Sequence, residues 1–415
     1  MGLSMSERKA VTKAMATRYA HGTKAQKGAI LDELCALTGW TRRHARRVLS
    51  DAERPPPPAK PRPVVYDAAV VDALRRVWVI LGGPCGKRLA PFLQEIIAAL
   101  ERHGELSVDP KVRAKLIAIS PATIDRVLAP DRKRLRVRGR SGTKPGSLLK
   151  AQIPIRTFAD WDETGPGFCE IDLVAHDGGN NLGEFCQTLN LTDVATGWTE
   201  MRAVKNKAQR WVFEALLDIE RSLPFSLSGI DSDNGAEFIN DQLLRYCTEH
   251  EITFTRTRPY RKNDNCFVEQ KNWTVVRQAV GYGRFEGETA VEVLNELYGW
   301  LRLWVNFFGP QQKLVSKTRT GARVTRRYDK AQTPLQRLLA SDGIPDPVKE
   351  DLLARYRGIN PVALTRRIGS LQKKLLKMAR SGDRAGLHAS SPDHPWKGDT
   401  RTFPVRQRNE LRRTS

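Results

Sequence analysis

Three acidic residues, Asp172, Asp233 and Glu269, have the types and settings that best suit chemistry. Asp172 lies inside the apolar run CEIDLVAH, where a charge is costly unless it has a partner or a metal ion. Asp233 follows a short strand in the turn SDNG, at the carboxyl end where α/β sheets place their ligands, and Glu269 lies near the start of a helix. Carboxylates from such elements can converge and hold hard divalent cations. Two such ions, roughly 3.5 to 4 Å apart, would activate an attacking oxygen and stabilise the leaving one in phosphodiester chemistry.

Four neighbouring side chains need a separate interpretation. Asp231 alternates with the turn aspartate, and we expect it to be a solvated strand residue. Glu237 suits the first turn of the next helix, where a carboxylate favours the helix dipole. His176 shares a strand side with the first aspartate and is either a satisfied strand-end histidine or a substrate contact. Trp273 follows the glutamate on the same side of its helix and is either core or a base-stacking platform.

The elements that must position these acids form an α/β pattern. Short β-rich runs at 167 to 176, 184 to 197 and 198 to 206 predict a three-stranded meander. Helical and strand patterns then alternate down to the helix that begins near Phe267. Three antiparallel strands followed by this alternation predict an α/β domain with a mixed sheet of five strands and flanking helices.

Charge and composition indicate a polyanionic partner. The 415 residues include 69 Lys and Arg against 46 Asp and Glu, a formal net charge of +23, which favours nucleic acid. No apolar run approaches the roughly 20 residues that a membrane-spanning helix needs, so we expect no membrane partner. The six cysteines are scattered without zinc-type spacing and predict buried thiols, no zinc and a cytoplasmic, DNA-associated protein.

Composition divides the chain into seven segments. The Pro-rich stretch is a stiff spacer, and the two basic runs on either side of the central region are predicted to be linkers that follow phosphates, with a solvated tether as the alternative. The predicted segments are a helix-turn-helix domain (1–53), a Pro-rich linker (54–64), a second helical domain (65–130), a basic linker (131–154), the catalytic core (155–310), a basic C-terminal region with helices (311–381) and a disordered tail (382–415).

The first segment has the length of a helix-turn-helix and a turn sequence between its two helical patterns. An apolar helical pattern is broken at LTGW, and a short arginine-rich helix follows, small enough to enter a major groove. A basic αα-hairpin is the alternative. DNA contacts are predicted in this helix at Arg42, Arg43, Arg46 and Arg47, and in the basic linker at Arg132, Lys133 and Arg134.

The words CEIDLVAHDGG, SDNGAEF and VEQKN, in that order, resemble the integrase catalytic core that retroviral integrases share with many bacterial insertion-sequence transposases. Asp233 and Glu269 are separated by 35 residues, positions 234 to 268, the interval those families favour. The resemblance covers roughly residues 155 to 310. Together with the helical units before it and the basic region after it, it makes the chain similar to an insertion-sequence transposase rather than to a retroviral enzyme.

The resemblance implies an RNase H-like fold with a DDE triad of Asp172, Asp233 and Glu269. It implies two divalent metal ions, Mg²⁺ or Mn²⁺, with Asp172 bridging both and each other acid binding one. Water would nick a transposon end, and the freed 3′-hydroxyl would attack target DNA, so that double-stranded DNA and a dimer or larger assembly are the expected partners. A cationic rim would offset the acids' repulsion of phosphates, and its predicted members are Arg258, Arg261, Lys262, Lys271 and Asn272.

One departure and two alternatives remain. Retroviral integrases begin with a zinc-binding domain that nothing here supplies, so the helix-turn-helix units would recognise DNA ends in another way. The core could belong to an inactive or domesticated DNA-binding regulator, which the intact acids argue against. It could also be a hydrolytic nuclease without strand transfer, which the helix-turn-helix units disfavour because they indicate duplex DNA.

Overall fold

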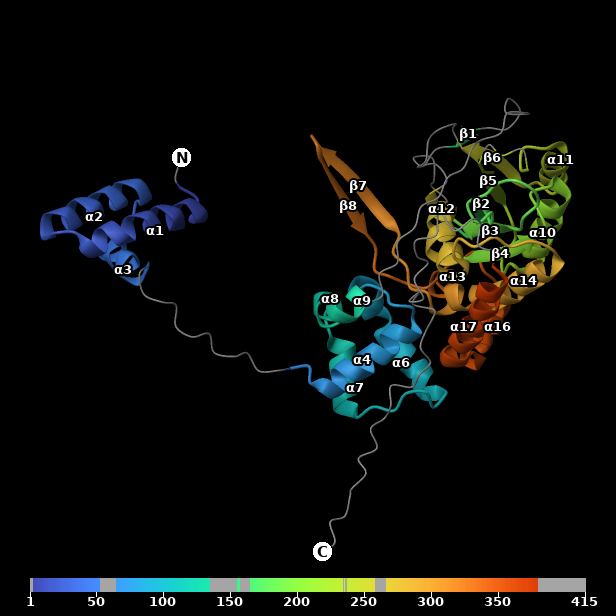
Figure 1. Cartoon of the computed structure of the whole chain (residues 1–415), viewed down its shortest axis with the longest axis horizontal. Coiled ribbons are helices and arrows are strands. Elements are labelled where there is room, and N and C mark those ends of the chain that lie inside the picture. Colours follow the sequence, from blue (N-terminus) through green and yellow to red (C-terminus); the bar gives the residue numbers. More distant parts are fainter. Residues whose placement is uncertain are drawn as a thin grey trace, which may run out of the picture. The chain divides into compact units, whose positions relative to one another are not determined.

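The computed structural model describes residues 3–52, 65–134, 155–156, 165–233, 235, 237–257 and 266–379. They fall into two units, Met1–Val65 and Tyr66–Ser415, each described here by itself (Figure 1). The Pro-rich linker, positions 135–154 of the basic linker and the predicted tail lie outside the described residues. None of the described helices is both long and apolar enough to cross a membrane.

The first unit is a bundle of three helices, α1 (Met5–His21), α2 (Lys24–Thr38) and α3 (Arg42–Ala52). Capping boxes at Ser4 and Thr23 start the first two helices, and Gly39, with φ of +71°, ends the second in a left-handed cap. The small apolar core is built around Leu34 and Leu49. The predicted helix, break and short basic helix are therefore present, and their binding to DNA stays a prediction.

The second unit contains the predicted mixed sheet. Its strands run in the order β1-β6-β5-β2-β3-β4, with β2 (Phe168–Ala175), β3 (Gln187–Asp193) and β4 (Thr199–Val204) forming the antiparallel meander. Strands β5 (Gly229–Ser232) and β6 (Thr253–Thr257) are parallel to β2 and to each other. The five predicted strands are confirmed, and a two-residue strand, β1 (Ile155–Arg156), adds a sixth beside β6.

Alternation along the strands gives the sheet two different faces. On one face, apolar side chains such as Ile171, Leu189 and Leu191 pack against α10 (Gln209–Ser222) and α11 (Asp241–Glu249). The opposite face carries polar residues and meets the helix that starts with α12 (Cys266–Lys271), continues as the π-helical segment η3 (Asn272–Arg277) and ends with α13 (Gln278–Val280). The carboxylates of β2 belong to this polar face.

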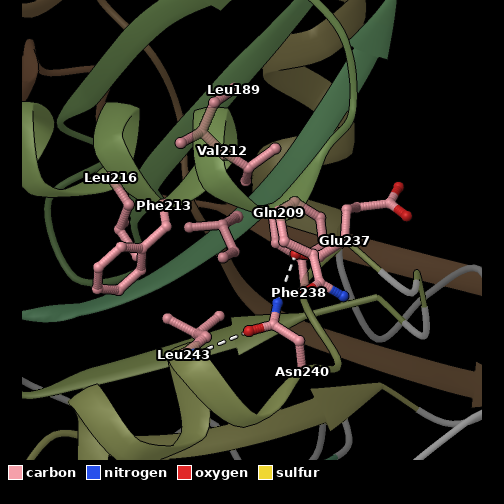
Figure 2. Close-up of a pocket in the computed structure, with 10 residues that line it drawn as sticks. Leu189, Gln209, Val212, Phe213, Leu216, Glu237, Phe238, Asn240 and Leu243 are labelled. Atoms are coloured by element: carbon pink, nitrogen blue, oxygen red, sulfur yellow. Dashed lines mark hydrogen bonds between the residues drawn. The ribbon is translucent and has the colours of Figure 1, made fainter.

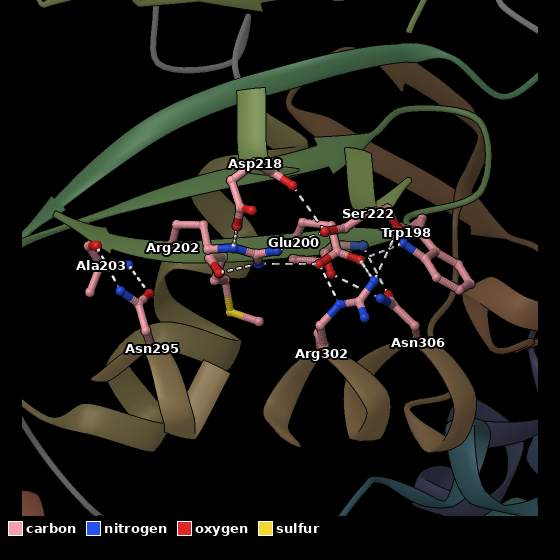
Figure 3. A network of polar contacts seen from close by, with 11 residues as sticks. Trp198, Glu200, Arg202, Ala203, Asp218, Ser222, Asn295, Arg302 and Asn306 are labelled. Atoms are coloured by element: carbon pink, nitrogen blue, oxygen red, sulfur yellow. Dashed lines mark hydrogen bonds and ion pairs between the residues drawn. The ribbon is translucent and has the colours of Figure 1, made fainter. Parts of the chain in front are cut away.

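Edge strand β4 is covered by the long helix α14 (Glu288–Leu303) and the π-helical turn η4 (Trp304–Phe308) that follows it. Figure 3 shows Asn295 and Asn306 reaching the strand, where each side-chain amide bonds both the N–H and the C=O of one backbone residue, at Ala203 and Thr199 respectively. Between them the fully buried Glu200 accepts hydrogen bonds from Arg302 and from the Trp198 indole. Polar side chains thus occupy the outer edge of the sheet.

The helices of the second predicted domain are α4 (Ala68–Ile80), α5 (Gly86–Leu89), η1 (Ala90–Phe92), α6 (Leu93–Arg102), α7 (Pro110–Ala118), α8 (Pro121–Val127) and α9 (Ala129–Arg134). They share one hydrophobic core with three C-terminal helices, α15 (Pro334–Leu339), α16 (Asp346–Gly358) and α17 (Pro361–Met378). Hydrogen bonds also cross this contact, for example from Asn360 to Glu105 at 2.8 Å. Segments that composition treats as separate thus pack together, and the domain boundaries stay predictions.

The basic run after the catalytic core is a hairpin rather than the predicted linker. Strands β7 (Leu314–Thr320) and β8 (Arg323–Tyr328) pair in antiparallel register, and Gly321 takes a φ of +60° in the turn between them (Figure 1). The hairpin was missed because exposed strands of alternating Arg and Thr carry no apolar periodicity. No acidic residue lies between positions 314 and 328.

Candidate active site

The sheet brings Asp172 and Asp233 to neighbouring positions. Strands β2 and β5 run parallel with Glu170 opposite Asp231 and Ile171 opposite Ser232, and each candidate acid comes directly after its registered pair. Glu269 lies on α12, which contacts β2 and β3, and its side chain is exposed. The fold therefore delivers the three acids from a strand, a strand end and a helix, as the sequence predicted.

The carboxylate of Asp172 interacts electrostatically with those of Asp233 and Glu269. Burial raises the pKa of Asp172 well above its usual range, and repulsion from Asp233 and then from Glu269 raises it further. Hydrogen bonds from the Leu173 N–H and from Asn272 act in the opposite direction, because they favour the ionised form. A carboxylate in this position is stabilised by any cation placed among the three acids.

The donor set suits a hard divalent cation, although the acids do not enclose one. Within the described residues, no group of three or more His, Cys, Asp or Glu side chains is arranged closely enough to hold a metal ion. Every candidate ligand is nevertheless a carboxylate, the oxygen donor that Mg²⁺ and Mn²⁺ favour. Their mutual repulsion is the electrostatic condition that such a cation would relieve.

Asn272 links the first aspartate to the helix of the glutamate. Its side-chain amide donates to Asp172 Oδ2 at 2.6 Å, and its own Oδ1 accepts a hydrogen bond from Asn190 Nδ2 at 2.7 Å. Asn190 lies opposite Asp172 on β3, and Asn272 is the first residue of the π-helical segment. The Asn272 amide, predicted to contact DNA, therefore positions the Asp172 carboxylate. Its helix turn is π-helical, and such wide turns are frequent at functional sites.

Two further acids, Glu170 on β2 and Asp231 on β5, lie two positions before Asp172 and Asp233 respectively. Asp231 is fully buried and accepts a hydrogen bond from Thr255, so the prediction of a solvated strand residue is wrong. Glu170 is also fully buried and accepts the Val268 N–H at 2.8 Å, which ties α12 to the sheet. Burial and repulsion from Asp231 raise the pKa of Glu170. Period two from Asp172 was the signal that could have found Glu170.

The turn after β5 holds Asp233 in place through local hydrogen bonds. The Gly235 N–H donates to Asp233 Oδ1 at 2.9 Å. Figure 2 shows Asn240 closing the turn, with its Nδ2 donating to the Glu237 carbonyl and its Oδ1 capping α11 at the Leu243 N–H. The helix begins at Asp241, so Glu237 lies before it and the predicted helix-start role of Glu237 is wrong.

Two ambiguous side chains are resolved. His176 is fully buried, hydrogen-bonds Thr188 Oγ1 through Nε2 at 2.7 Å and packs edge-on against Phe285. Burial and the nearby Arg277 lower its pKa to about 3, which supports the structural alternative. Trp273 is 57% exposed, so the core interpretation is wrong.

The predicted DNA contacts divide into three groups. Arg42, Arg43, Arg46 and Arg47 are all exposed on α3, although Arg42 forms an ion pair with Asp32. Lys133 is exposed too, whereas Arg132 pairs with Asp125 at 2.6 Å. The side chains of Arg134, Arg258, Arg261 and Lys262 lie outside the described residues.

Lys271 differs from the exposed rim that was predicted. It is only 7% exposed, and its Nζ donates to Gln311 Oε1 at 2.6 Å. Burial lowers its pKa to about 7, and repulsion from Arg88 and Arg337 contributes. Helical phase was the available signal, since a residue two positions after the exposed Glu269 lies on the other side of the helix.

The chain is similar to several known proteins. Residues 164–262 match the family model described as "Integrase core domain". The chain is 42% identical over 335 residues to the uncharacterized protein y4rM of Sinorhizobium fredii, an alignment that covers 81% of this chain and 96% of y4rM. It is also similar to the catalytic core domain of BIV integrase, with 16% identity, a TM-score of 0.30, and coverage of 43% of this chain and 97% of that one. For the HTLV-2 integrase catalytic core domain in complex with magnesium, the identity is 14%, the TM-score 0.27 and the coverage 35% and 91%.

Proposed function

Because the chain belongs to the integrase and transposase family, we propose that it is a DDE transposase. Residues 164–262 match the integrase core domain, and y4rM is a relative along most of the chain. The chain would cut the ends of a mobile DNA element and join the freed 3′-hydroxyl groups to target DNA. The observation that supports the proposal is that parallel strands β2 and β5 place Asp172 and Asp233 at neighbouring positions, while Asn272, three residues after Glu269, donates to Asp172. Repulsion from Asp233 and Glu269 raises the pKa of Asp172 in the same sense.

The proposed site residues have distinct tasks. Asp172, Asp233 and Glu269 would hold Mg²⁺ or Mn²⁺, which when bound supplies charge neutralisation and an activated oxygen for phosphodiester chemistry. Asn272 orients the Asp172 carboxylate, and Asn190 fixes the Asn272 amide in turn.

The reaction would proceed in two displacements at phosphorus. Hydrolysis breaks one phosphodiester bond at the element's end and leaves a 3′-hydroxyl. In strand transfer this hydroxyl attacks a target phosphodiester, so one bond forms as another breaks and no covalent protein intermediate is needed. Joining two ends to one target favours a dimer or larger assembly, acting on DNA in the cytoplasm and, in a prokaryotic host, at the nucleoid.

The test uses the full chain, Mg²⁺ or Mn²⁺, and a labelled duplex that carries the ends of the element. We expect nicking and joining by the native chain, and neither by Asp233→Asn. Asp241→Asn is the matched control, because it removes an exposed acid eight positions further on and should leave the reaction unchanged. Cleavage without joining would favour the nuclease, and binding without cleavage would favour the regulator.

A further inference from the structure

A cavity lies beside the candidate active site, on the α12 side of the sheet. It has a volume of about 330 Å³, opens to solvent and is lined by the end of β3, by α12 and by the base of the β7–β8 hairpin. We call it the Lys271 pocket, and its defining residues are Thr192, Lys271, Gln311, Lys313, Arg326 and Tyr328. Three of these six are cationic, and no acidic residue lines it within the described part of the chain.

Lys271 places a buried amine at this cavity without an acidic partner among the described residues. Its ammonium group is buried and has three donors, and Gln311 Oε1 is the acceptor that it meets. Among the described residues no carboxylate forms an ion pair with it, and Gln311 supplies one acceptor for its three donors. An anion beside this amine would supply further acceptors for its N–H groups.

Thr192 provides a second, independent observation at this cavity. Its side chain is fully buried, and its hydroxyl has no hydrogen-bond partner among the described residues. Buried hydroxyls are rarely left unpaired in folded proteins. Glu170 lies opposite Thr192 on β2, and while its Oε2 accepts the Val268 N–H, its Oε1 also has no hydrogen-bond partner among the described residues. Thr192 lines the cavity and Glu170 does not, so an acceptor bound in the cavity would take the hydrogen bond of the Thr192 hydroxyl.

The position of the pocket relates it to the three acids. Thr192 follows Asn190 by two positions on β3 and shares its face, and Asn190 bonds the amide that holds Asp172. Lys271 stands next to Asn272 in the same helix. A ligand in the pocket therefore lies on the same face of the sheet as Asp172, beside Thr192 and two residues along β3 from Asn190.

We propose that the Lys271 pocket binds a phosphate group of the DNA backbone, held by the Lys271 ammonium and the Thr192 hydroxyl with Lys313 and Arg326 around it. The inference rests on the proposed function, because DNA is the phosphate source it names. Phosphate oxygens accept strong hydrogen bonds from lysine and arginine and match the cationic lining. The bound phosphate would anchor one strand beside the reacting bond and set how far the DNA enters the active site.

The test measures duplex binding by the full chain without divalent metal, over a series of salt concentrations. Lys271→Met removes the charge and keeps the length of the side chain. We expect the salt slope of the affinity to fall by about 1, the loss of one phosphate contact. Thr192→Val, which keeps the shape of threonine, should weaken binding by roughly 2- to 10-fold, as expected for a lost hydrogen bond. Lys207→Met removes an exposed lysine as the control for charge alone.

A second measurement uses inorganic phosphate as the probe. Phosphate should raise the melting temperature of the native chain above that in chloride of equal ionic strength, and Lys271→Met should abolish the difference. An unchanged salt slope in a folded Lys271→Met chain would overturn the assignment to DNA, and the phosphate response would then indicate a free anion. If Lys271→Met does not fold, an undiminished affinity in Thr192→Val decides against the pocket. A native chain that binds phosphate but no DNA refutes the proposed function and leaves an anion site.

Discussion

Replacing Asn272 with alanine tests whether the active site depends on the amide that holds Asp172. The native hydrogen bond joins an amide to a carboxylate at 2.6 Å, and bonds to charged groups contribute roughly 1.5 to 3 kcal/mol. Its loss raises the pKa of Asp172 further, so that a proton competes better with a metal ion. At about 1.4 kcal/mol per decade, the metal affinity should fall roughly 10- to 100-fold.

The assay follows the Mg²⁺ and Mn²⁺ dependence of both the melting temperature and the nicking rate, at pH 6 and at pH 8. For Asn272→Ala we expect half-saturation at higher metal concentration, a larger shift at the lower pH, and recovery of the rate at saturating metal. Asn190→Ala should shift it less, because the direct bond to Asp172 remains. Thr274→Val is the control, since its hydroxyl bonds the Gln270 carbonyl within the same helix. If Asn272→Ala kept native half-saturation at both pH values, the amide would not position Asp172.

Three further predictions concern neighbouring parts of the fold. Trp273→Ala should weaken DNA binding by roughly 1 to 3 kcal/mol without changing the melting temperature, because the exposed indole would stack on a base. An affinity equal to that of the native chain refutes this. Trp300→Ala is the control, because Trp300 is also exposed. Arg302→Leu leaves the buried Glu200 charge without its main partner and should lower the free energy of unfolding by about 3 to 5 kcal/mol in urea titrations, whereas a loss under 1 kcal/mol contradicts it. His176 has a depressed pKa in the folded chain, so the unfolded chain binds more protons below pH 6.5; stability should fall by up to about 1.4 kcal/mol per pH unit from pH 6 towards 3, a slope that His176→Gln should reduce.

The strands and the elements that carry the three acids could be predicted because the relevant information is local. Asp172 stands in an alternating run and Asp233 in a turn that closes a strand, and parallel neighbours bring such positions together. Contacts that join distant segments were out of reach. Asn190 and Asn272 are 82 residues apart, and nothing in either segment marks one amide as the partner of the other.

Other errors came from signals that charge obscured. The segment of β7 and β8 predicts a linker that follows phosphates because it is rich in basic residues, although Gly321 stands where a turn needs a positive φ. The sequence predicts a solvated Asp231 because acids usually are, but β5 is a central parallel strand in a sheet covered on both faces, so side chains on either side of it are buried. Burial of charge depends on neighbours in the fold, which a sequence pattern does not contain.

The amides of Asn295 and Asn306 have a consequence for self-association. A free sheet edge offers unpaired N–H and C=O groups on which a strand of another molecule can grow. At Thr199 and Ala203 these groups are already bonded to side chains of the same chain. A strand of another copy therefore finds no free backbone groups at these two positions of β4. Helix α14 and two asparagine side chains together protect this edge against aggregation.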